Sequence, residues 1–189
     1  MKTRLLLACL LAVACSQESN AGSGKPVVIA VDRPETQSAA SFTLASRDFK
    51  AGETIPTRFS AYGDGLSPHL SWSHLPDGTK TLAVMMEDPD ASSAKPFVHW
   101  LAWNIDPKAG ALQQGSVTPG AALGKNSRGT PSYFGPRPPG KAPHHYHFQV
   151  FALDSSLALK PGSSRDQLLA AMNGHVLAKA DLIGLFGKP

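Results

Sequence analysis

Three groups of residues in this sequence have side chains that could do acid–base chemistry or bind an anion. The first is the run Asp88-Pro89-Asp90, in which Asp88 has the same parity as the apolar residues before it. The second is His99, and the third is His144 with Tyr146, which a strand would place on one face. A carboxylate, two imidazoles and a phenol could share protons with a bound oxyanion or donate hydrogen bonds to it.

Each of these groups also has a purely structural interpretation. Asp and Pro are common turn residues, so the run 88–90 could be a simple turn. We expect His99 to share a strand face with Phe97, Leu101 and Trp103, where a core histidine would bond to the backbone. A nearby carboxylate would instead raise the pKa of this imidazole. The segment 133–143 could be a Pro-rich surface turn, although Gly135 would let its backbone approach a ligand closely.

The sequence predicts no metal, no cofactor and no catalytic residue. Three of the seven His lie between His144 and His147, but a zinc site needs three or four ligands at suitable spacing and both Cys precede Ser16. The strand-to-helix motif Gly-x-Ser-x-Gly of serine hydrolases is missing. A weak hydrolase that uses Asp88 and the imidazoles as general acid and base stays open as a minor alternative.

Short strands separated by turn residues must position these groups, and they indicate a mainly β fold. We expect strands at Ser41–Ala45, Thr57–Ala61, His69–Ser73, Thr81–Glu87, Phe97–Ile105 and His144–Leu153. The long segment 106–143 has little periodicity, which is typical of functional loops. Two short helices close the chain in this prediction, one after a capping box at 164–167 and one over His175–Phe186.

The first 40 residues differ in composition from the rest of the chain. Residues 1–15 have Lys2 and Arg4 before an apolar run, which is the pattern of an export signal, and Cys15 is a candidate for lipidation. Residues 16–40 are expected to form a flexible tether, and 41–189 to form the domain. The protein is therefore expected in the periplasm, or at the membrane through a lipid anchor on Cys15.

Length and composition favour one domain and exclude some partners. The chain has 189 residues, of which 42% are hydrophobic, enough for a single core. With both Cys within the first 15 residues, the domain has no disulfide. The net charge is +4 and the sequence has no block of basic residues, so we expect no nucleic-acid partner.

Taken together, these motifs resemble the phosphatidylethanolamine-binding family, also called Raf kinase inhibitor-like proteins. The resemblance covers roughly residue 41 to the end, and the pieces that carry it are Asp88-Pro89-Asp90-Ala91, His99-Trp100, Asn104, Gly135-Pro136-x-Pro138-Pro139, His144-x-Tyr146-x-Phe148 and Ser67-Pro68-x-Leu70-Ser71-Trp72. Residues 175–180 are similar to the final helix of the bacterial branch.

The resemblance implies a Greek-key β-sandwich-like fold of antiparallel sheets with a shallow pocket for phosphate, phosphorylethanolamine or acetate. The matching pocket positions are Asp88, His99, Gly135, Pro136, His144 and Tyr146, with Asp90 and Trp100 beside them. Binding through protonated histidines should strengthen below about pH 6.5.

A protein partner is the alternative that the resemblance leaves open, since the family includes protease inhibitors. In that case the Pro-rich loop 131–143 would dock in the cleft of a hydrolase or another protein. Kinase inhibition is not carried over, because the chain is expected to be exported and has Ser92-Ser93-Ala94 where animal members continue with Pro.

Overall fold

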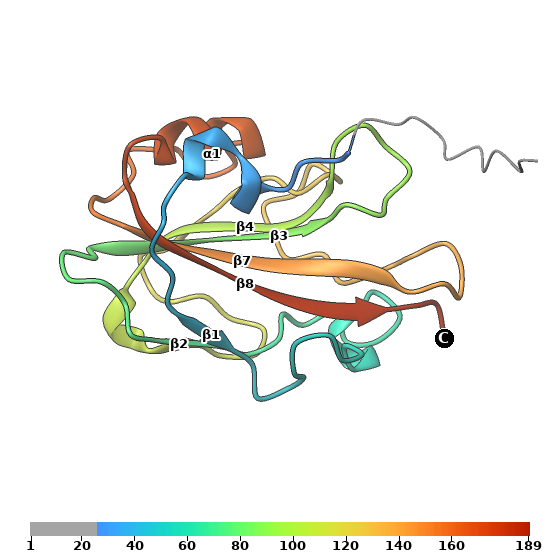
Figure 1. The fold of residues 1–189 in the computed structure, drawn as a ribbon. Helices are drawn as coiled ribbons and strands as arrows, with labels where there is room; N and C mark the ends of the chain where they lie inside the picture. Colours follow the sequence, from blue (N-terminus) through green and yellow to red (C-terminus); the bar gives the residue numbers. More distant parts are fainter. Residues whose placement is uncertain (1–25) are drawn as a thin grey trace, which may run out of the picture.

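Two antiparallel sheets make up the body of the protein in a computed structural model that describes residues 26–189 (Figure 1). The larger sheet has the order β6 (Ala122–Leu123), β4 (Phe97–Ile105), β3 (Thr81–Asp88), β7 (His144–Leu153), β8 (Val176–Phe186). The smaller sheet has the order β1 (Thr43–Ala45), β2 (Leu70–Ser73), β5 (Ala111–Leu112). The expected signal peptide 1–15, with Cys15, and residues 16–25 lie outside the described part.

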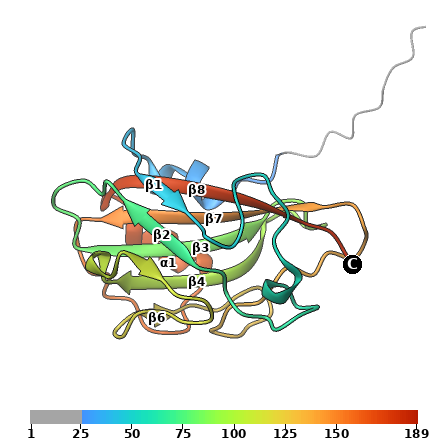
Figure 2. The same cartoon turned by 90° about the horizontal axis from the view of Figure 1, so that it is seen from below.

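The main core lies between the two sheets, which Figure 2 shows from below. Leu70 and Trp72 of the small sheet pack there against alternate residues of β3, β4 and β7, among them Val84, Trp100 and Phe148. These side chains are nearly inaccessible to water, and their burial is the main stabilising contribution. The prediction of a mainly β, sandwich-like fold of antiparallel sheets is therefore confirmed.

A second apolar cluster covers the other face of the large sheet. Leu101 and Trp103 of β4 contact the single α-helix of the described residues, α1 (Arg165–Met172), through Leu168 and Leu169. The predicted capping box is present, with the Ser164 side chain and Gln167 bonding to each other's backbone N–H groups. The first of the two expected helices is therefore confirmed.

The second expected helix is wrong, because residues Val176–Phe186 form strand β8. Apolar residues at 176, 177, 180 and 183 fit a helix, yet the buried residues are Ala178, Leu182, Gly184 and Phe186. These share the even parity of a strand, and β8 pairs with β7 from His144 opposite Phe186 to Leu153 opposite Val176. Pairing with a long central strand overrides the local helical pattern.

The strand expected at Thr57–Ala61 is also wrong. Residues Thr57–Phe59 form the 3₁₀ turn η3, which follows Pro56. The turn leaves the Phe59 carbonyl and the Ala61 N–H free of any sheet, and both bond to the loop that leads into β7. The remaining turns are η1 (Ala30–Asp32), η2 (Pro34–Thr36) and η4 (Pro107–Ala109).

The part of the expected tether that the structure describes, residues 26–40, packs on the domain. Glu87 is fully buried and accepts hydrogen bonds from the Ala30 N–H at 2.6 Å, from Gln149 at 2.9 Å and from Arg165. Arg165 also donates to the Val28 carbonyl at 3.1 Å. The ordered domain therefore begins before Ser41, because a buried charge network holds this segment.

Among the described residues, none of the helical segments has the length and apolar character needed to span a bilayer.

Candidate functional site

One end of the large sheet brings most of the predicted site residues together. Asp88 is the last residue of β3, His144 is the first of β7, and Phe97 opens β4 directly opposite Asp88. Antiparallel pairing therefore places these three strand ends side by side. They border a cavity of about 300 Å³ lined by Asp88, Ala91, Ser92, Phe97, His99, Arg128, Phe134, Arg137, Pro138, Pro139, His144 and Tyr146.

A β-bulge directs His99 into this cavity. Met86 lies opposite Trp100 and Glu87 lies opposite Val98, so His99 is the extra residue of β4. Such bulges re-aim side chains. His99 consequently lies with Phe97 at the cavity, whereas Leu101 and Trp103 belong to the cluster under α1. The expectation that His99 shares a face with Leu101 and Trp103 is wrong for this reason.

Asp88 and His144 form a hydrogen-bonded pair at the cavity wall. The two side chains are 5% and 16% exposed, and His144 Nδ1 lies 2.8 Å from Asp88 Oδ2. Burial raises the pKa of Asp88, and the hydrogen bond to His144 opposes this effect only in part. The pair therefore presents a carboxyl group that holds its proton more readily than an exposed Asp does.

His99 has a different partner from the one expected. Its Nδ1 lies 2.6 Å from the Phe134 carbonyl oxygen, to which the ring donates, and its ring stacks on Phe134 with centroids 5.7 Å apart. Burial lowers the pKa of His99 to about 4. The expected rise through a carboxylate is wrong, and this imidazole is neutral at physiological pH.

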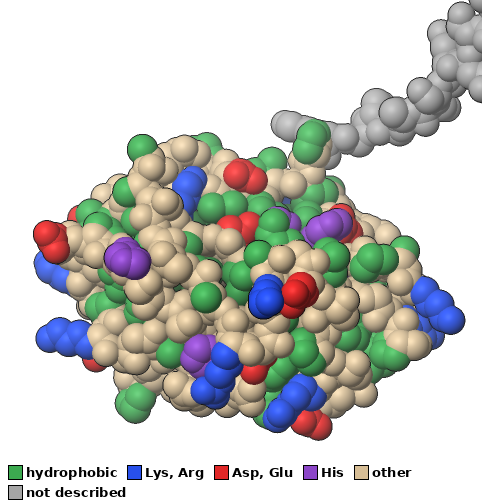
Figure 3. All heavy atoms as spheres, turned by 60° about the horizontal axis from the view of Figure 1, so that its bottom comes forward, with side chains coloured by type: hydrophobic (Ala, Val, Ile, Leu, Met, Phe, Trp, Pro, Cys, Tyr) green, Lys and Arg blue, Asp and Glu red, His purple; other side chains and the backbone are tan. Residues whose placement is uncertain are grey.

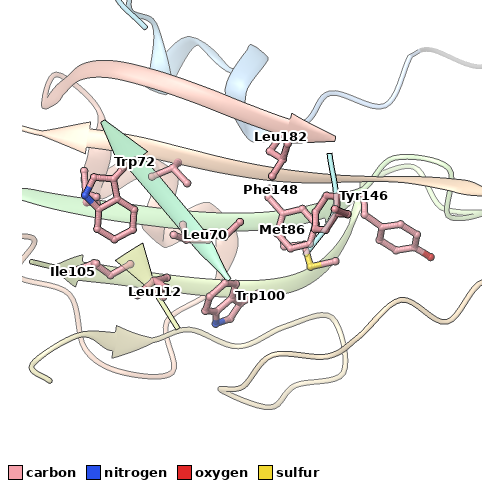
Figure 4. Packing of buried hydrophobic residues seen from close by; sticks show 14 of the residues in the cluster. Leu70, Trp72, Met86, Trp100, Ile105, Leu112, Tyr146, Phe148 and Leu182 are labelled. Carbon is pink, nitrogen blue, oxygen red and sulfur yellow. The ribbon is translucent and has the colours of Figure 1, made fainter. Parts of the chain in front are cut away.

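Tyr146 contributes a hydroxyl group with no hydrogen-bond partner among the described residues. The residue is fully buried, and Figure 4 shows its ring at the end of the core cluster with the oxygen pointing away from the other labelled residues. Burial, followed by the charge of Asp88, raises the pKa of Tyr146 above its usual value, and the nearby backbone N–H of Arg137 opposes this effect only in part without forming a hydrogen bond of ordinary geometry. The phenol therefore keeps its proton and lies at a cavity where a ligand could accept it.

Gly135 and Pro136 do not line the cavity, and they position its wall instead. A Cβ on Gly135 would lie 2.6 Å from the Phe59 carbonyl oxygen, so only glycine allows this close backbone contact. The Ala61 N–H donates to the Pro136 carbonyl at 3.0 Å, and Tyr62 donates to the Pro138 carbonyl at 3.0 Å. These contacts fix the loop that carries Arg137 to Pro139.

Asp90 and Trp100 lie beside the cavity rather than in it. Asp90 accepts from the backbone N–H and the ring of His145, at 2.7 and 2.8 Å. Although partial burial acts in the opposite direction, these bonds lower the pKa of Asp90. Trp100 is 2% exposed and packs edge-on against Tyr133 in the core. Both residues support the site from outside.

The sequence interpretation missed the cationic and aromatic residues of the cavity. Arg128 lies over the Phe134 ring, with its guanidinium carbon 4.8 Å from the ring centroid, and Arg137 is exposed on the opposite loop. No ion pair with either guanidinium is formed among residues 26–189. Arg128 lies in an irregular stretch with no motif of its own, so only the fold could place it here.

Basic and acidic side chains are interspersed on the face shown in Figure 3. Within the described range, no three His, Cys, Asp or Glu side chains are arranged to hold a metal ion.

Comparison with known proteins identifies the family. The family model for phosphatidylethanolamine-binding protein matches residues 45–187. A UPF0098 protein of Methanothermobacter thermautotrophicus is 41% identical over 148 residues, which are 76% of this chain and 97% of that protein. A Mycobacterium tuberculosis protein named "Putative lipoprotein LppC" is 37% identical over 163 residues, covering 85% of this chain and 80% of its own length.

Solved structures agree with this assignment. A homologue from Chlamydia trachomatis has a TM-score of 0.74 and 36% identity, and the match covers 80% of this chain and all of that one. Escherichia coli YbcL, described as a member of the mammalian PEBP family, has a TM-score of 0.74 and 30% identity over 79% of this chain and all of its own. The chain described here therefore belongs to the phosphatidylethanolamine-binding protein family.

Proposed function

We propose that the protein binds small phosphate-bearing molecules or other small oxyanions in the cavity between Asp88, His99, His144 and Tyr146. The observation that carries this proposal is the buried Tyr146 hydroxyl without a partner. A buried polar group left unpaired costs free energy, so native proteins seldom keep one without a reason. An oxygen atom of a ligand in the cavity would accept this hydrogen bond.

The charges around the cavity support an anionic ligand. Arg128 and Arg137 are exposed at its mouth and form no ion pair among the described residues, whereas Asp88 inside is paired with His144. Unpaired guanidinium groups at a concave site attract anions and offer two parallel donors to a phosphate or carboxylate. The volume of about 300 Å³ is at the lower limit of ligand pockets and suits a headgroup-sized molecule.

The proposal also includes export of the protein. Lys2, Arg4 and the apolar run that follows them have the pattern of an export signal, and Cys15 is the proposed lipidation site. A relative that is named as a putative lipoprotein, and whose match covers 85% of this chain, supports this part of the proposal. Labelling with a radioactive fatty acid, with Cys15→Ala as control, tests the anchor.

Calorimetric titration with phosphate and phosphorylethanolamine at pH 6 tests the binding function. We expect His144→Ala to weaken binding at least tenfold, because it removes the partner of Asp88 and a polar group of the wall. The matched control is His175→Ala, since His175 forms an equally short pair with Asp154. His175 lies just before the first residue of β8, whereas His144 lies opposite the last residue of β8, so the two histidines are at opposite ends of the sheet. Absence of binding by the unaltered protein would refute the proposal.

A second candidate function uses the loop 131–143 as a docking element for a hydrolase or another protein. The observation that favours it is the fixed loop conformation, held by Tyr62 and by Tyr133, whose hydroxyl donates to the Phe59 carbonyl at 2.8 Å. Rigid loops bind with little loss of conformational entropy. If the double variant Arg137→Ala, Pro139→Ala captured a protein partner as well as the unaltered protein does, this loop would be excluded as the docking element.

A further inference from the structure

While the buried Asp88 carboxylate is ionised, it accepts hydrogen bonds and cannot donate them. Asp88 Oδ1 accepts from the Asp90 N–H at 2.8 Å, and Oδ2 pairs with His144 Nδ1 at 2.8 Å. Each carboxylate oxygen has two lone pairs, so both atoms can still accept another proton-bearing group. A ligand beside Asp88 therefore meets free lone pairs.

His99 adds a second acceptor at the same depth. Its Nδ1–H is used by the Phe134 carbonyl at 2.6 Å, so the free nitrogen of the neutral ring, Nε2, carries a lone pair. The side chain is 3% exposed, and its pKa of about 4 keeps it neutral from pH 6 to pH 8. Throughout this range His99 accepts and does not donate at Nε2.

Donors are scarce inside the cavity and plentiful at its mouth. The Tyr146 hydroxyl is the fixed internal donor, and His144 Nε2 donates only when that ring is doubly protonated. Arg128 and Arg137 supply guanidinium donors and Ser92 supplies a hydroxyl, but all three side chains are exposed. The interior thus offers a carboxyl group whose two oxygens lie at hydrogen-bond distance from the Asp90 N–H and His144 Nδ1, as in an ionised acceptor, and an imidazole lone pair.

An oxyanion without a proton has only lone pairs to present to these acceptors. Its oxygens would face Asp88 and His99 without hydrogen bonds and close to a negative charge, which is unfavourable at a desolvated site. An oxyanion that keeps one proton can donate it to Asp88 or to His99, accept from Tyr146, and place its charged oxygens toward the arginines.

We propose that the cavity selects oxyanions that still carry a proton, such as the monoanion of a phosphate monoester, and rejects fully deprotonated oxyanions of the same shape, such as sulfate. This inference rests on the proposed binding function and narrows its ligand class. The charged groups that face the bound proton are Asp88 on β3, His144 on β7, and Arg128 and Arg137 on the loops, with Asp90 just outside.

A matched pair of tetrahedral anions tests the inference. The experiment uses the whole chain. We expect phosphate at pH 6 to bind about 10- to 100-fold more tightly than sulfate, the ratio that one hydrogen bond to a charged group provides. Equal affinity for both anions would overturn the inference and leave the binding function intact. Absence of binding for both would overturn the function itself.

The pH dependence separates a proton on the ligand from a proton on the protein. Phosphate monoesters lose their second proton near pH 6, so with a dianion that binds 10- to 100-fold more weakly the affinity for phosphorylethanolamine should fall roughly 5- to 25-fold between pH 6 and pH 8. Protonation of His144 would also favour binding at low pH, but it would act on sulfate as well. Sulfate binding that strengthens in parallel with phosphate as the pH falls would therefore contradict the inference.

Asp88→Asn examines the acceptor directly. The amide has one oxygen in place of two, so either His144 or the Asp90 N–H loses its acceptor, and the new N–H₂ group is a donor; the preference for phosphate over sulfate should therefore shrink to within about threefold. Asp154→Asn is the control, since Asp154 forms an equally short pair with His175 away from the cavity and should leave the ratio unchanged. Thermal unfolding of both variants verifies that they fold. An unchanged ratio in a folded Asp88→Asn would refute the role of this carboxylate.

Discussion

Two neighbouring carboxylates on β3, Glu87 and Asp88, differ in their hydrogen-bond partners. Glu87 faces the side of the sheet covered by α1 and the N-terminal segment, where Arg165, Gln149 and the Ala30 N–H all donate to it. Asp88 points to the other side, where it pairs with His144 at the wall of the cavity. One position in the sequence separates a fully paired carboxylate from one that is open to a ligand.

The hydrogen bonds around each carboxylate, rather than the residue type, distinguish a structural group from a candidate ligand-binding group. Around Glu87 every donor is supplied by the protein, as expected for a structural group. Around Asp88 the adjacent Tyr146 hydroxyl lacks a partner, and the arginines at the mouth lack carboxylates among the described residues. A buried polar cluster that its own chain leaves incomplete is the one that a ligand would complete.

The largest expected effect comes from removing the cation that pairs with Glu87. Arg165→Met should lower the free energy of unfolding by about 3–5 kcal/mol, because it leaves the Glu87 charge buried without its cation. Urea unfolding measures the change. Lys95→Met removes an exposed ion pair with Asp166 and should cost less than about 1 kcal/mol. Similar losses in the two variants would contradict the structural role of the network.

A smaller effect on stability, of opposite sign, is expected from a substitution in the cavity. Tyr146→Phe removes a hydroxyl that has no partner, so the unliganded protein should gain about 1 kcal/mol of stability while losing affinity for phosphate. Tyr133→Phe removes a hydroxyl that donates to the Phe59 carbonyl, and should lose about 1 kcal/mol. Loss of stability in Tyr146→Phe would indicate a protein partner for that hydroxyl.

The smallest effect is a difference in pH dependence between two His–Asp pairs of equal length. Burial raises the pKa of Asp88, so its ionisation opposes folding and its contribution worsens as the pH rises above 3.8. The hydrogen bond from His175 lowers the pKa of Asp154, so its contribution is lost as the pH falls below 3.8.

Stability profiles from pH 2 to pH 7 reveal these opposite slopes. Asp88→Asn should improve stability relative to the unaltered protein as the pH rises, whereas Asp154→Asn should narrow its deficit as the pH falls. Parallel profiles for the two variants would show that burial does not distinguish the pairs.

Much of the site was predictable from local sequence. Asp88 and His99 each follow or interrupt an apolar run, and the alternation of His144 with Tyr146 placed both on one face of a strand. The structure brings these four residues to one cavity. The role of Gly135 was not predictable, since its lack of a Cβ serves contact with Phe59, which is distant in the sequence.

Failures of the prediction occur where a local pattern competes with a distant partner. The apolar residues of 176–186 fit a helix and a strand about equally, and ten residues of β7 with free hydrogen-bonding groups decide for the strand. The protonation of His99 was misjudged for a similar reason, because its partner is the Phe134 carbonyl and not a carboxylate.

The sequence by itself determined strands β1, β2, β3, β4 and β7, the capped helix and the identity of the acid–base residues, because periodicity, capping and turn chemistry act over a few neighbouring positions. Only the tertiary structure decided which groups are paired and which are open. The bulge that turns His99, the arginines at the cavity mouth and the burial that shifts each pKa depend on segments that meet across tens of residues. Those contacts set the local dielectric and supply the missing donors and acceptors.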